Sequence, residues 1–408
     1  MNILFMTHYF PPESNAPANR VSDMARYWVS KGHQVTIITN HPNHRMGGIY
    51  DGYENKPYSW DEWNGVRVLR VWTMTREKYT TATQTLSYLV YMGLASTAAA
   101  LIQDADVVIA TSPHFFCGLG GTVMAKLLRR KMIVEIRDLW PESFNAVGVV
   151  ENKLLLDSLE QLELWMYRNA GRIVVVTDSF KTNMVDRGIN PDKIDVIFNG
   201  IDSQHFSPDA IEPLPRAELG LEGKFVVSYI GTIGRGQNLP SILRVMKNCE
   251  RYPDIAFVIM GGGAELELLQ MTAGSLGLTN LQILGHQPAK RAKGLLAATD
   301  LSLVHLRKSD VFKKVIPSKM FESMGMKKPV ILGVEGESAR ILRESEAGIA
   351  VEPENVEMHT EAILELYKNR ALREQMGENG RKAVVEKYDR RHLAQRYLEI
   401  MQRFTGCS

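Results

Sequence analysis

Lys319 and Glu322, one helical turn apart, are residues whose types and spacing suit the binding of a nucleotide. They follow Pro317, which favours the first turn of a helix because its ring fixes φ and its missing N–H costs nothing there. A helix that starts at Pro317 leaves the amides of Ser318, Lys319 and Met320 without helical partners. These amides and the positive end of the helix dipole attract an anion, and the ammonium of Lys319 adds a full charge.

The carboxylate of Glu322 suits the sugar of the same nucleotide. It lies roughly 5–6 Å further along the helix face that carries Ser318 and Lys319. Its oxygens only accept hydrogen bonds, which fits the two vicinal hydroxyls of a ribose. The alternative is an ordinary helix in which Lys319 and Glu322 form an ion pair. Because an apolar strand at 329–332 follows directly, the sequence favours a nucleoside diphosphate site.

Composition indicates an ordinary folded protein. The 408 residues carry a net charge of +2 and are 45% apolar, which predicts two or three domains. Cys117, Cys249 and Cys407 fit no disulfide framework or ligand cluster, so we expect a reducing compartment and no structural metal. The chain runs from Met1 into the apolar stretch 3–6 without a basic leader or cleavage site, which predicts a protein that is not secreted.

Short β-branched runs alternate with helical patterns along the whole chain. The runs in the first half are 3–6, 35–39, 66–71, 107–110, 133–136 and 173–177, and those in the second are 225–230, 256–260, 281–284, 301–304, 330–332 and 349–351. This alternation predicts an α/β protein with two Rossmann-like domains, each a parallel sheet covered on both faces. Three prolines within 207–215 predict an extended linker between them, and 381–404 reads as one amphipathic helix.

The segment from Pro317 to Glu322 resembles the retaining glycosyltransferases of family 4, which have the GT-B fold. Their mark is a Glu, seven residues and a second Glu; Glu322 matches the second, whereas Lys314 stands at the first. The resemblance implies two doubly wound parallel-sheet domains facing across a cleft. It places an acceptor-side domain at 1–206 and a nucleotide-sugar domain at 216–387, and implies that a helix at 388–408 returns to the first domain.

The resemblance also implies which residues contact the donor. Glycines in 231–236 and 261–263 let the backbone approach phosphate, and Arg235 can bind it bidentately together with Lys319. Gln237 stands near the position where the family has a Lys, and His286 lies where the family contacts the base. The expected donor-binding residues are Gly231, Gly234, Arg235, Gly262, His286, Ser318, Lys319, Met320, Phe321 and Glu322.

Polar residues that follow strands of the first half are the acceptor-side candidates, because ligands of open α/β sheets bind at the carboxyl ends of strands. The sequence from Asp138 to Glu142 resembles a segment of bacterial surface-polysaccharide members, so we expect these two carboxylates to be catalytic. Asp138 could instead cap a helix. Asn15, Arg20 and His114 are the expected acceptor-binding residues, and the alternative for Arg20 is a solvated helix residue.

The apolar stretch 86–102 predicts a helix that packs on the sheet, faces a membrane or, at its lower length limit, spans one. The basic cluster at 126–131 would be attracted to anionic lipid. Together they predict a cytoplasmic enzyme, peripheral at the inner face of the cytoplasmic membrane.

The likeness is greatest to O-antigen and capsule enzymes that add sugars such as N-acetylated L-fucosamine (L-FucNAc). It implies a retaining transferase that uses a UDP-sugar, a lipid-linked saccharide acceptor, no cofactor and no metal. Two alternatives stay open at this point, a UDP-sugar epimerase and a non-catalytic, two-lobed protein that binds sugar nucleotides.

Overall fold

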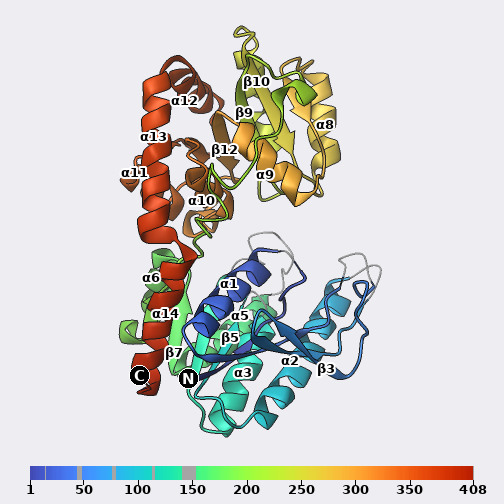
Figure 1. The fold of residues 1–408 in the computed structure, drawn as a ribbon, viewed down its shortest axis with the longest axis vertical. Coiled ribbons are helices and arrows are strands. Elements are labelled where there is room, and N and C mark those ends of the chain that lie inside the picture. Colours follow the sequence, from blue (N-terminus) through green and yellow to red (C-terminus); the bar gives the residue numbers. More distant parts are fainter. Residues whose placement is uncertain (14, 44–47, 76–79, 113–114, 140–152, 408) are drawn as a thin grey trace. The chain divides into compact units, whose positions relative to one another are not determined.

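The computed structural model describes residues 1–13, 15–43, 48–75, 80–112, 115–139 and 153–407. The predicted site residues His114 and Glu142 lie outside the described residues. The chain forms two compact units, unit 1 with residues 1–199 and 390–408 and unit 2 with residues 200–389 (Figure 1). The predicted linker 207–215 lies within unit 2, where the Leu214 N–H donates to the Gly294 carbonyl at 2.8 Å.

Unit 1 is built on an eight-stranded sheet of order β3-β4-β2-β1-β5-β6-β7-β8, parallel except for β3 against β4. Its strands are β1 (Asn2–Met6), β2 (Gln34–Asn40), β3 (Tyr58–Trp63), β4 (Val66–Val71), β5 (Val107–Thr111), β6 (Met132–Ile136), β7 (Arg172–Val175) and β8 (Ile194–Val196). All six predicted strands are present. The two additional strands are β3, an edge strand with acidic residues, and β8, which is three residues long.

The helices of unit 1 cover both faces of this sheet (Figure 1). They are α1 (Ala16–Ser30), α2 (Thr81–Leu101), α3 (Phe115–Leu127), α5 (Lys153–Asn169), α6 (Asp178–Asp186) and α14 (Arg390–Thr405). Successive residues of a strand point to opposite faces, so Leu4 joins the core under α2 and α3 whereas Ile3 joins the core under α1 and α14. The Trp28 indole N–H donates to the Ala394 carbonyl at 2.9 Å, which ties α14 to α1.

Helix α2 packs on the sheet of unit 1, as one of the three readings of 86–102 predicted. Tyr91, Ala95 and Ala99 are buried in the core, and the Tyr91 hydroxyl donates to the Thr7 carbonyl at 2.7 Å. Among the helices that the structure describes, none has the length and apolarity needed to cross a membrane. The spanning interpretation of 86–102 is therefore wrong.

Unit 2 has a six-stranded sheet of order β11-β10-β9-β12-β13-β14 in which all neighbouring strands are parallel. Its strands are β9 (Phe225–Ile230), β10 (Ile255–Met260), β11 (Leu281–Ile283), β12 (Leu301–His305), β13 (Val330–Gly333) and β14 (Gly348–Ala350). Its helices are α7 (Leu243–Cys249), α8 (Leu266–Ser275), α9 (Ala289–Ala298), α10 (Ser318–Gly325), α11 (Glu337–Glu344), α12 (Val356–Lys368) and α13 (Arg370–Ala383). Both units thus confirm the predicted Rossmann-like class.

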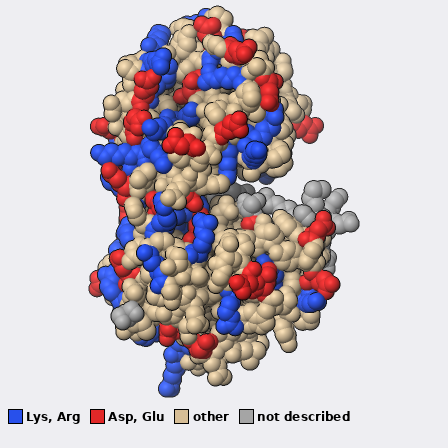
Figure 2. All heavy atoms as spheres, viewed as in Figure 1, with Lys and Arg blue, Asp and Glu red and all other residues tan. Residues whose placement is uncertain are grey.

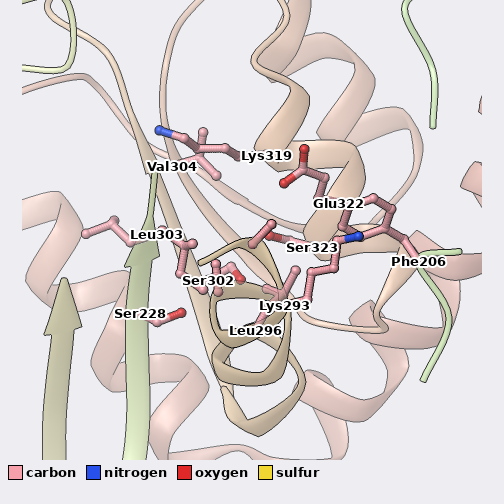
Figure 3. Close-up of a pocket in the computed structure, with 13 residues that line it drawn as sticks. Phe206, Ser228, Lys293, Leu296, Ser302, Leu303, Val304, Lys319, Glu322 and Ser323 are labelled. Carbon is pink, nitrogen blue, oxygen red and sulfur yellow. The ribbon is translucent and has the colours of Figure 1, made fainter. Parts of the chain in front are cut away.

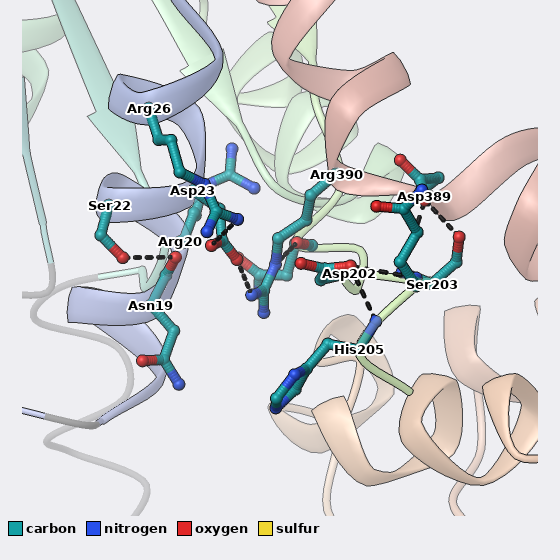
Figure 4. A network of polar contacts seen from close by, with 12 residues as sticks. Asn19, Arg20, Ser22, Asp23, Arg26, Asp202, Ser203, His205, Asp389 and Arg390 are labelled. Atoms are coloured by element: carbon teal, nitrogen blue, oxygen red, sulfur yellow. Dashed lines mark hydrogen bonds and ion pairs between the residues drawn. The ribbon is translucent and has the colours of Figure 1, made fainter. Parts of the chain in front are cut away.

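The predicted continuous helix over 381–404 is wrong. Helix α13 ends at Ala383, a π-helical turn spans Val384–Tyr388, and α14 begins at Arg390. Asp389 between them has an extended backbone and is buried, and its carboxylate accepts hydrogen bonds from the amide and the hydroxyl of Ser203 (Figure 4). Amphipathic periodicity continues through such a break, so the pattern alone could not reveal it.

His305 fixes two loops of unit 2 through its neutral ring. Its Nδ1 lies 2.7 Å from the Gln237 carbonyl, which can only accept, so Nδ1 carries the proton. Its Nε2 accepts a hydrogen bond from the Glu354 N–H at 3.0 Å. Burial lowers the pKa of His305 to about 4, although the Gln237 carbonyl opposes this shift.

His305 should therefore make the protein less stable in mild acid. Its folded pKa lies below the unfolded value of about 6.5, so its contribution is complete above that pH and is lost as pH falls toward 4. Between pH 7 and 4.5 we expect the free energy of unfolding, measured with urea, to fall by about 2 kcal/mol more in wild type than in His305→Asn. His392→Asn, at an exposed position of α14, serves as the control. Equal pH dependence of wild type and His305→Asn would contradict this assignment.

Candidate functional site

The carboxyl ends of the strands of unit 2 bring three glycine turns together. The Gly231 N–H donates to the Met260 carbonyl, and the Gly261 N–H donates to the Gly285 carbonyl, both at 2.8 Å. A Cβ on Gly261 would lie 1.7 Å from the Gly231 oxygen, so a larger residue cannot occupy that position. Without side chains, these turns pack closely together and their backbone stays accessible to a ligand at the carboxyl edge of the sheet.

The side chain of Lys319, from the first turn of α10, lies directly over the first of these turns. A Cβ on Gly231 would lie 2.0 Å from Lys319 Cε. The ammonium donates to the Tyr229 hydroxyl at 2.6 Å and lies 4.2 Å from the centre of that ring. The hydroxyl in turn donates to the Thr232 carbonyl at 2.6 Å. The ammonium is thus held at the turn by a residue at the end of β9.

Burial gives this ammonium an unusual electrostatic state. It lowers the pKa of Lys319 to about 8, and the negative charge of Glu322 opposes the shift. Desolvation disfavours the charged form, so an anion bound beside the ammonium would restore the lost stabilisation. The ammonium donates to Tyr229 while the charge of Glu322 also acts on it, so the alternative of a Lys319–Glu322 ion pair is not tested by this placement.

A cavity of about 200 Å³ opens beside Lys319 (Figure 3). Glu322 and Ser323 of α10 line it together with Lys293 of α9 and Phe206. Burial lowers the pKa of Lys293 as well, and Glu322 again opposes the shift. One carboxylate therefore acts on two ammonium groups from different helices. The remaining lining residues are Ser228, Ile230, Ala289, Ala292, Leu296, Ser302, Leu303 and Val304.

The start of α10 differs in detail from the prediction. The helix begins at Ser318, and Pro317 is its N-cap. The Met320 N–H donates to the Pro317 carbonyl at 3.1 Å, so this amide is not available to a ligand as predicted. The Met320 and Phe321 side chains are fully buried. The anion site at this helix is thus reduced to the amides of Ser318 and Lys319.

The other predicted donor residues lie in loops at the same edge of the sheet. Arg235 is exposed in the turn after β9, and Gly234 in that turn lies close to the Gln237 side chain. Gly262 lies against His286, since a Cβ on Gly262 would be 3.3 Å from the His286 Cβ. This placement is compatible with the predicted donor contacts of these four residues, Gly234, Arg235, Gly262 and His286, but does not test them.

No pattern in the sequence predicts that His305, Arg307 and Phe312 hold the Arg235 loop. The ring of His305 bonds to the carbonyl of Gln237, and the Arg307 N–H donates to the carbonyl of Gly236 at 2.8 Å. The Phe312 ring also packs on Gly236. Phe312 belongs to the 3-10 turn Phe312–Lys314, so the loop that carries Lys314 in place of the family's first Glu reaches the same edge.

In unit 1, Arg20 is buried and its donors are occupied (Figure 4). It forms an ion pair with Glu135 at 3.2 Å and donates to the carbonyls of Ile197 and Phe198 at 3.0 and 2.6 Å. This placement supports neither predicted interpretation of Arg20. The side chain is not solvated, and its nitrogens bond to the protein rather than pointing to an acceptor. The sequence could not reveal this role, because Glu135 reads as part of an apolar strand.

Asn15 and Asp138 lie at element ends of unit 1. The Ala18 N–H donates to the Asn15 side chain at 2.9 Å, so Asn15 caps α1. Asp138 is half-buried directly after β6, and its charge acts on the neighbouring Arg137. The roles of these two residues in binding and catalysis stay predictions.

Comparisons with known proteins agree with this architecture. Residues 15–200 match the glycosyl transferase 4-like domain, and residues 212–383 match the glycosyl transferases group 1 family. A putative colanic acid biosynthesis glycosyl transferase, WcaI of Escherichia coli K12, is 24% identical over 370 residues, which cover 88% of this chain and 90% of the relative.

Solved structures show the same fold. Sucrose-phosphate synthase of Thermosynechococcus elongatus superposes with a TM-score of 0.76 at 14% identity and covers all of both chains. HepE of Anabaena, solved in complex with UDP, superposes with a TM-score of 0.73 at 15% identity over 99% of this chain and 100% of its own. The predicted GT-B fold is confirmed.

Gly231 should not tolerate a side chain, because its φ is +142° and a Cβ would displace Lys319. We expect Gly231→Ala to lower the free energy of unfolding by about 1–3 kcal/mol. The matched control is Gly274→Ala in α8, where a Cβ meets open space; there we expect a gain of up to about 1 kcal/mol. Urea unfolding measures both. Equal stability changes in the two variants would show that the packing of Lys319 on Gly231 is not required.

Proposed function

Because the chain belongs to the group 1 and 4-like glycosyltransferase superfamily with the GT-B fold, we propose that it transfers a sugar from a UDP-sugar to a lipid-linked saccharide with retention of configuration. The observation that carries this proposal is the ammonium of Lys319, held over the Gly231 turn one helical turn from Glu322. The family match favours a transferase over the epimerase and the non-catalytic binder.

The donor would bind along α10. Its diphosphate lies against the Gly231 turn, the Ser318 and Lys319 amides and the Lys319 ammonium, where a dianion compensates the desolvated cation. Its ribose hydroxyls donate to Glu322 at the neighbouring cavity. UDP in the structure of the Anabaena protein supports uridine as the base.

The donor sugar and the pathway are proposed from likeness. The similarity to a colanic acid glycosyl transferase over most of the chain supports a role in surface polysaccharide synthesis, such as O-antigen or capsule. From the likeness to O-antigen and capsule enzymes we propose an N-acetylated deoxyhexose such as L-FucNAc as the donor sugar.

Retention would proceed on one face of the sugar. Lys314 leaves the donor loop without the carboxylate that a covalent intermediate needs at this position. Instead, the departing phosphate oxygen, stabilised by Lys319 and Arg235, accepts the proton of the acceptor hydroxyl while the sugar passes through an oxocarbenium-like state. Asp138 would orient the acceptor or stabilise this positive charge, with Glu142 beside it in sequence.

Three neighbouring helices of unit 1 support an approach to a membrane. Helix α3 packs against both α2 and α5, and much of the face of this unit in view is uncharged (Figure 2). The exposed leucines of these helices are Leu86, Leu89, Leu94, Leu101, Leu127, Leu154, Leu155 and Leu162. Exposed apolar side chains gathered in one region are typical of docking to another apolar phase.

The predicted basic cluster at 126–131 offers less positive charge to anionic lipid than its sequence indicated. Arg130 donates to the carbonyls of Ala99 and Ile102 at the end of α2, at 2.9 and 2.5 Å. Lys126 donates to Asn169, and Lys131 donates to the Thr405 carbonyl, both at 2.5 Å. Only part of the charge in this cluster is therefore available to lipid head groups.

The donor assignment is tested by UDP affinity in calorimetry. Removing a charged partner typically costs about 10- to 100-fold in affinity, so we expect this loss in Glu322→Ala and in Lys319→Ala. Because the pKa of Lys319 is about 8, affinity should also decrease as pH rises above 8, and Lys319→Arg should remove this decrease. Glu344→Ala, on the exposed side of α11, should bind UDP like wild type. Unchanged affinity in Glu322→Ala and Lys319→Ala would refute the donor site.

Membrane docking is tested by sedimentation with liposomes of anionic phospholipid. Leu101, Leu127 and Leu154 are each more than three quarters exposed. Changing all three to Ser should reduce pelleting at least tenfold, since burying a leucine contributes about 1.5–3 kcal/mol. Leu268→Ser, half-exposed on α8 of unit 2, should have no effect. Equal pelleting of the triple variant and wild type would exclude this surface.

A further inference from the structure

Arg137, at the carboxyl end of β6 in unit 1, has a guanidinium that the described residues satisfy only in part. Its Nε and Nη1 are buried and have no hydrogen-bond partner among those residues. A buried donor left without a partner is destabilising, and the cost is larger for a charged group. Burial lowers the pKa of Arg137 to about 10, which leaves it charged at neutral pH.

The groups around Arg137 are already engaged with other partners. Glu135, whose charge acts on Arg137, accepts from Arg20 at 3.2 Å and from the Thr111 hydroxyl at 2.9 Å. Arg390 forms an ion pair with Asp23. Both Arg20 and Arg390 act on Arg137 as like charges, opposed by Glu135 and Asp138. Because Glu135 pairs with Arg20 and Asp23 pairs with Arg390, neither of these two acids is an exclusive partner of Arg137.

Other buried or half-buried arginines of this chain bond to acids or carbonyls of the protein. Arg20 uses Nε, Nη1 and Nη2, and Arg70 bonds to Asp61 and to the carbonyls of Pro11 and Asn40. Arg381 donates to three carbonyls of unit 2. Arg187 also has an unpartnered buried Nε, but its Nη2 pairs with Glu160 and Glu163. Arg137 differs from these arginines in having two such nitrogens.

The position of Arg137 is that of a ligand-binding residue. Its backbone N–H donates to the Ser112 hydroxyl at 2.7 Å, and the Ser112 N–H donates to the Glu135 carbonyl at 2.8 Å. These bonds fix Arg137 where β5 and β6 end, at the edge where open parallel sheets bind ligands. A guanidinium binds the two oxygens of a phosphate or a carboxylate through Nε with Nη2 or through Nη1 with Nη2, so a bidentate oxyanion would satisfy one of the two unpartnered nitrogens.

We propose that Arg137 binds an oxyanion of the acceptor, either a phosphate of its lipid carrier or a carboxylate of an acidic sugar. The inference rests on the proposed function, because it assigns the acceptor to unit 1. It adds a specificity-determining residue beside Asp138: acceptors that carry a negative charge near the reacting hydroxyl are selected over neutral ones.

The melting temperature distinguishes a ligand-binding role of Arg137 from a structural one. An unsatisfied charge costs stability, so Arg137→Met should keep or raise the melting temperature. Arg20→Met, the matched control, leaves Glu135 buried without its ion pair and should lower the melting temperature by several degrees. A decrease in Arg137→Met as large as that in Arg20→Met would show that Arg137 holds the fold, and would overturn the proposal.

Binding tests the ligand class directly. The full chain with Lys319→Ala, which removes the ammonium of the donor site, is titrated calorimetrically with geranyl diphosphate, glucuronate and neutral glucose. We expect at least one anion to bind, Arg137→Met to weaken it at least tenfold, Arg137→Lys to weaken it less, and glucose not to bind. Binding of geranyl diphosphate alone indicates a lipid phosphate, and binding of glucuronate alone indicates an acidic sugar.

Two outcomes of this titration overturn the proposal, namely binding of neither anion and anion binding unchanged by Arg137→Met. These readouts do not depend on UDP. If wild type fails to bind UDP, the proposed function is wrong whatever Arg137 binds. If UDP binds and Arg137→Met has no effect, only the role of Arg137 is wrong.

Discussion

The hydrogen bond from the Lys319 ammonium to the Tyr229 hydroxyl is the interaction on which the candidate site depends. It links the first turn of α10 to the end of β9, and it requires that position 231 be glycine because the lysine side chain occupies the space of a Cβ. The same placement desolvates the ammonium and lowers its pKa. A cation held in this state, near Glu322 and a cavity, is prepared for a dianion before the ligand arrives, and such preorganisation strengthens binding.

In unit 1, two arginines with buried nitrogens differ in whether the protein supplies hydrogen-bond partners. Arg20 is buried with Nε, Nη1 and Nη2 all hydrogen-bonded, so its charge stabilises the packing of α1 against the end of the sheet. Arg137, two residues after the partner of Arg20, is left with two buried nitrogens that have no hydrogen-bond partner in the part of the chain that the structure describes. Proteins retain such locally unfavourable groups mainly where a function requires them. We therefore infer a ligand for Arg137 and not for Arg20.

The sequence predicted the sheet well because the buried parallel strands are continuous apolar runs bounded by turns. It missed β3, where Asp61 and Glu62 interrupt the pattern on an edge strand, and it did not predict the break at Asp389, which depends on Ser203 far away in the chain. Lys319 and Glu322 could be predicted because both lie in one short helix, one turn apart. The role of Arg20 and the link from Lys319 to Tyr229 depend on residues 115 and 90 positions away, which no local pattern reveals.

A crystal structure of the full chain with UDP would test the donor site at α10. We expect a diphosphate oxygen to lie within hydrogen-bond distance of the Lys319 ammonium, roughly 2.7–3.2 Å, and a ribose hydroxyl to donate to Glu322. A nucleotide bound elsewhere, or bound at α10 with its ribose away from Glu322, would contradict it.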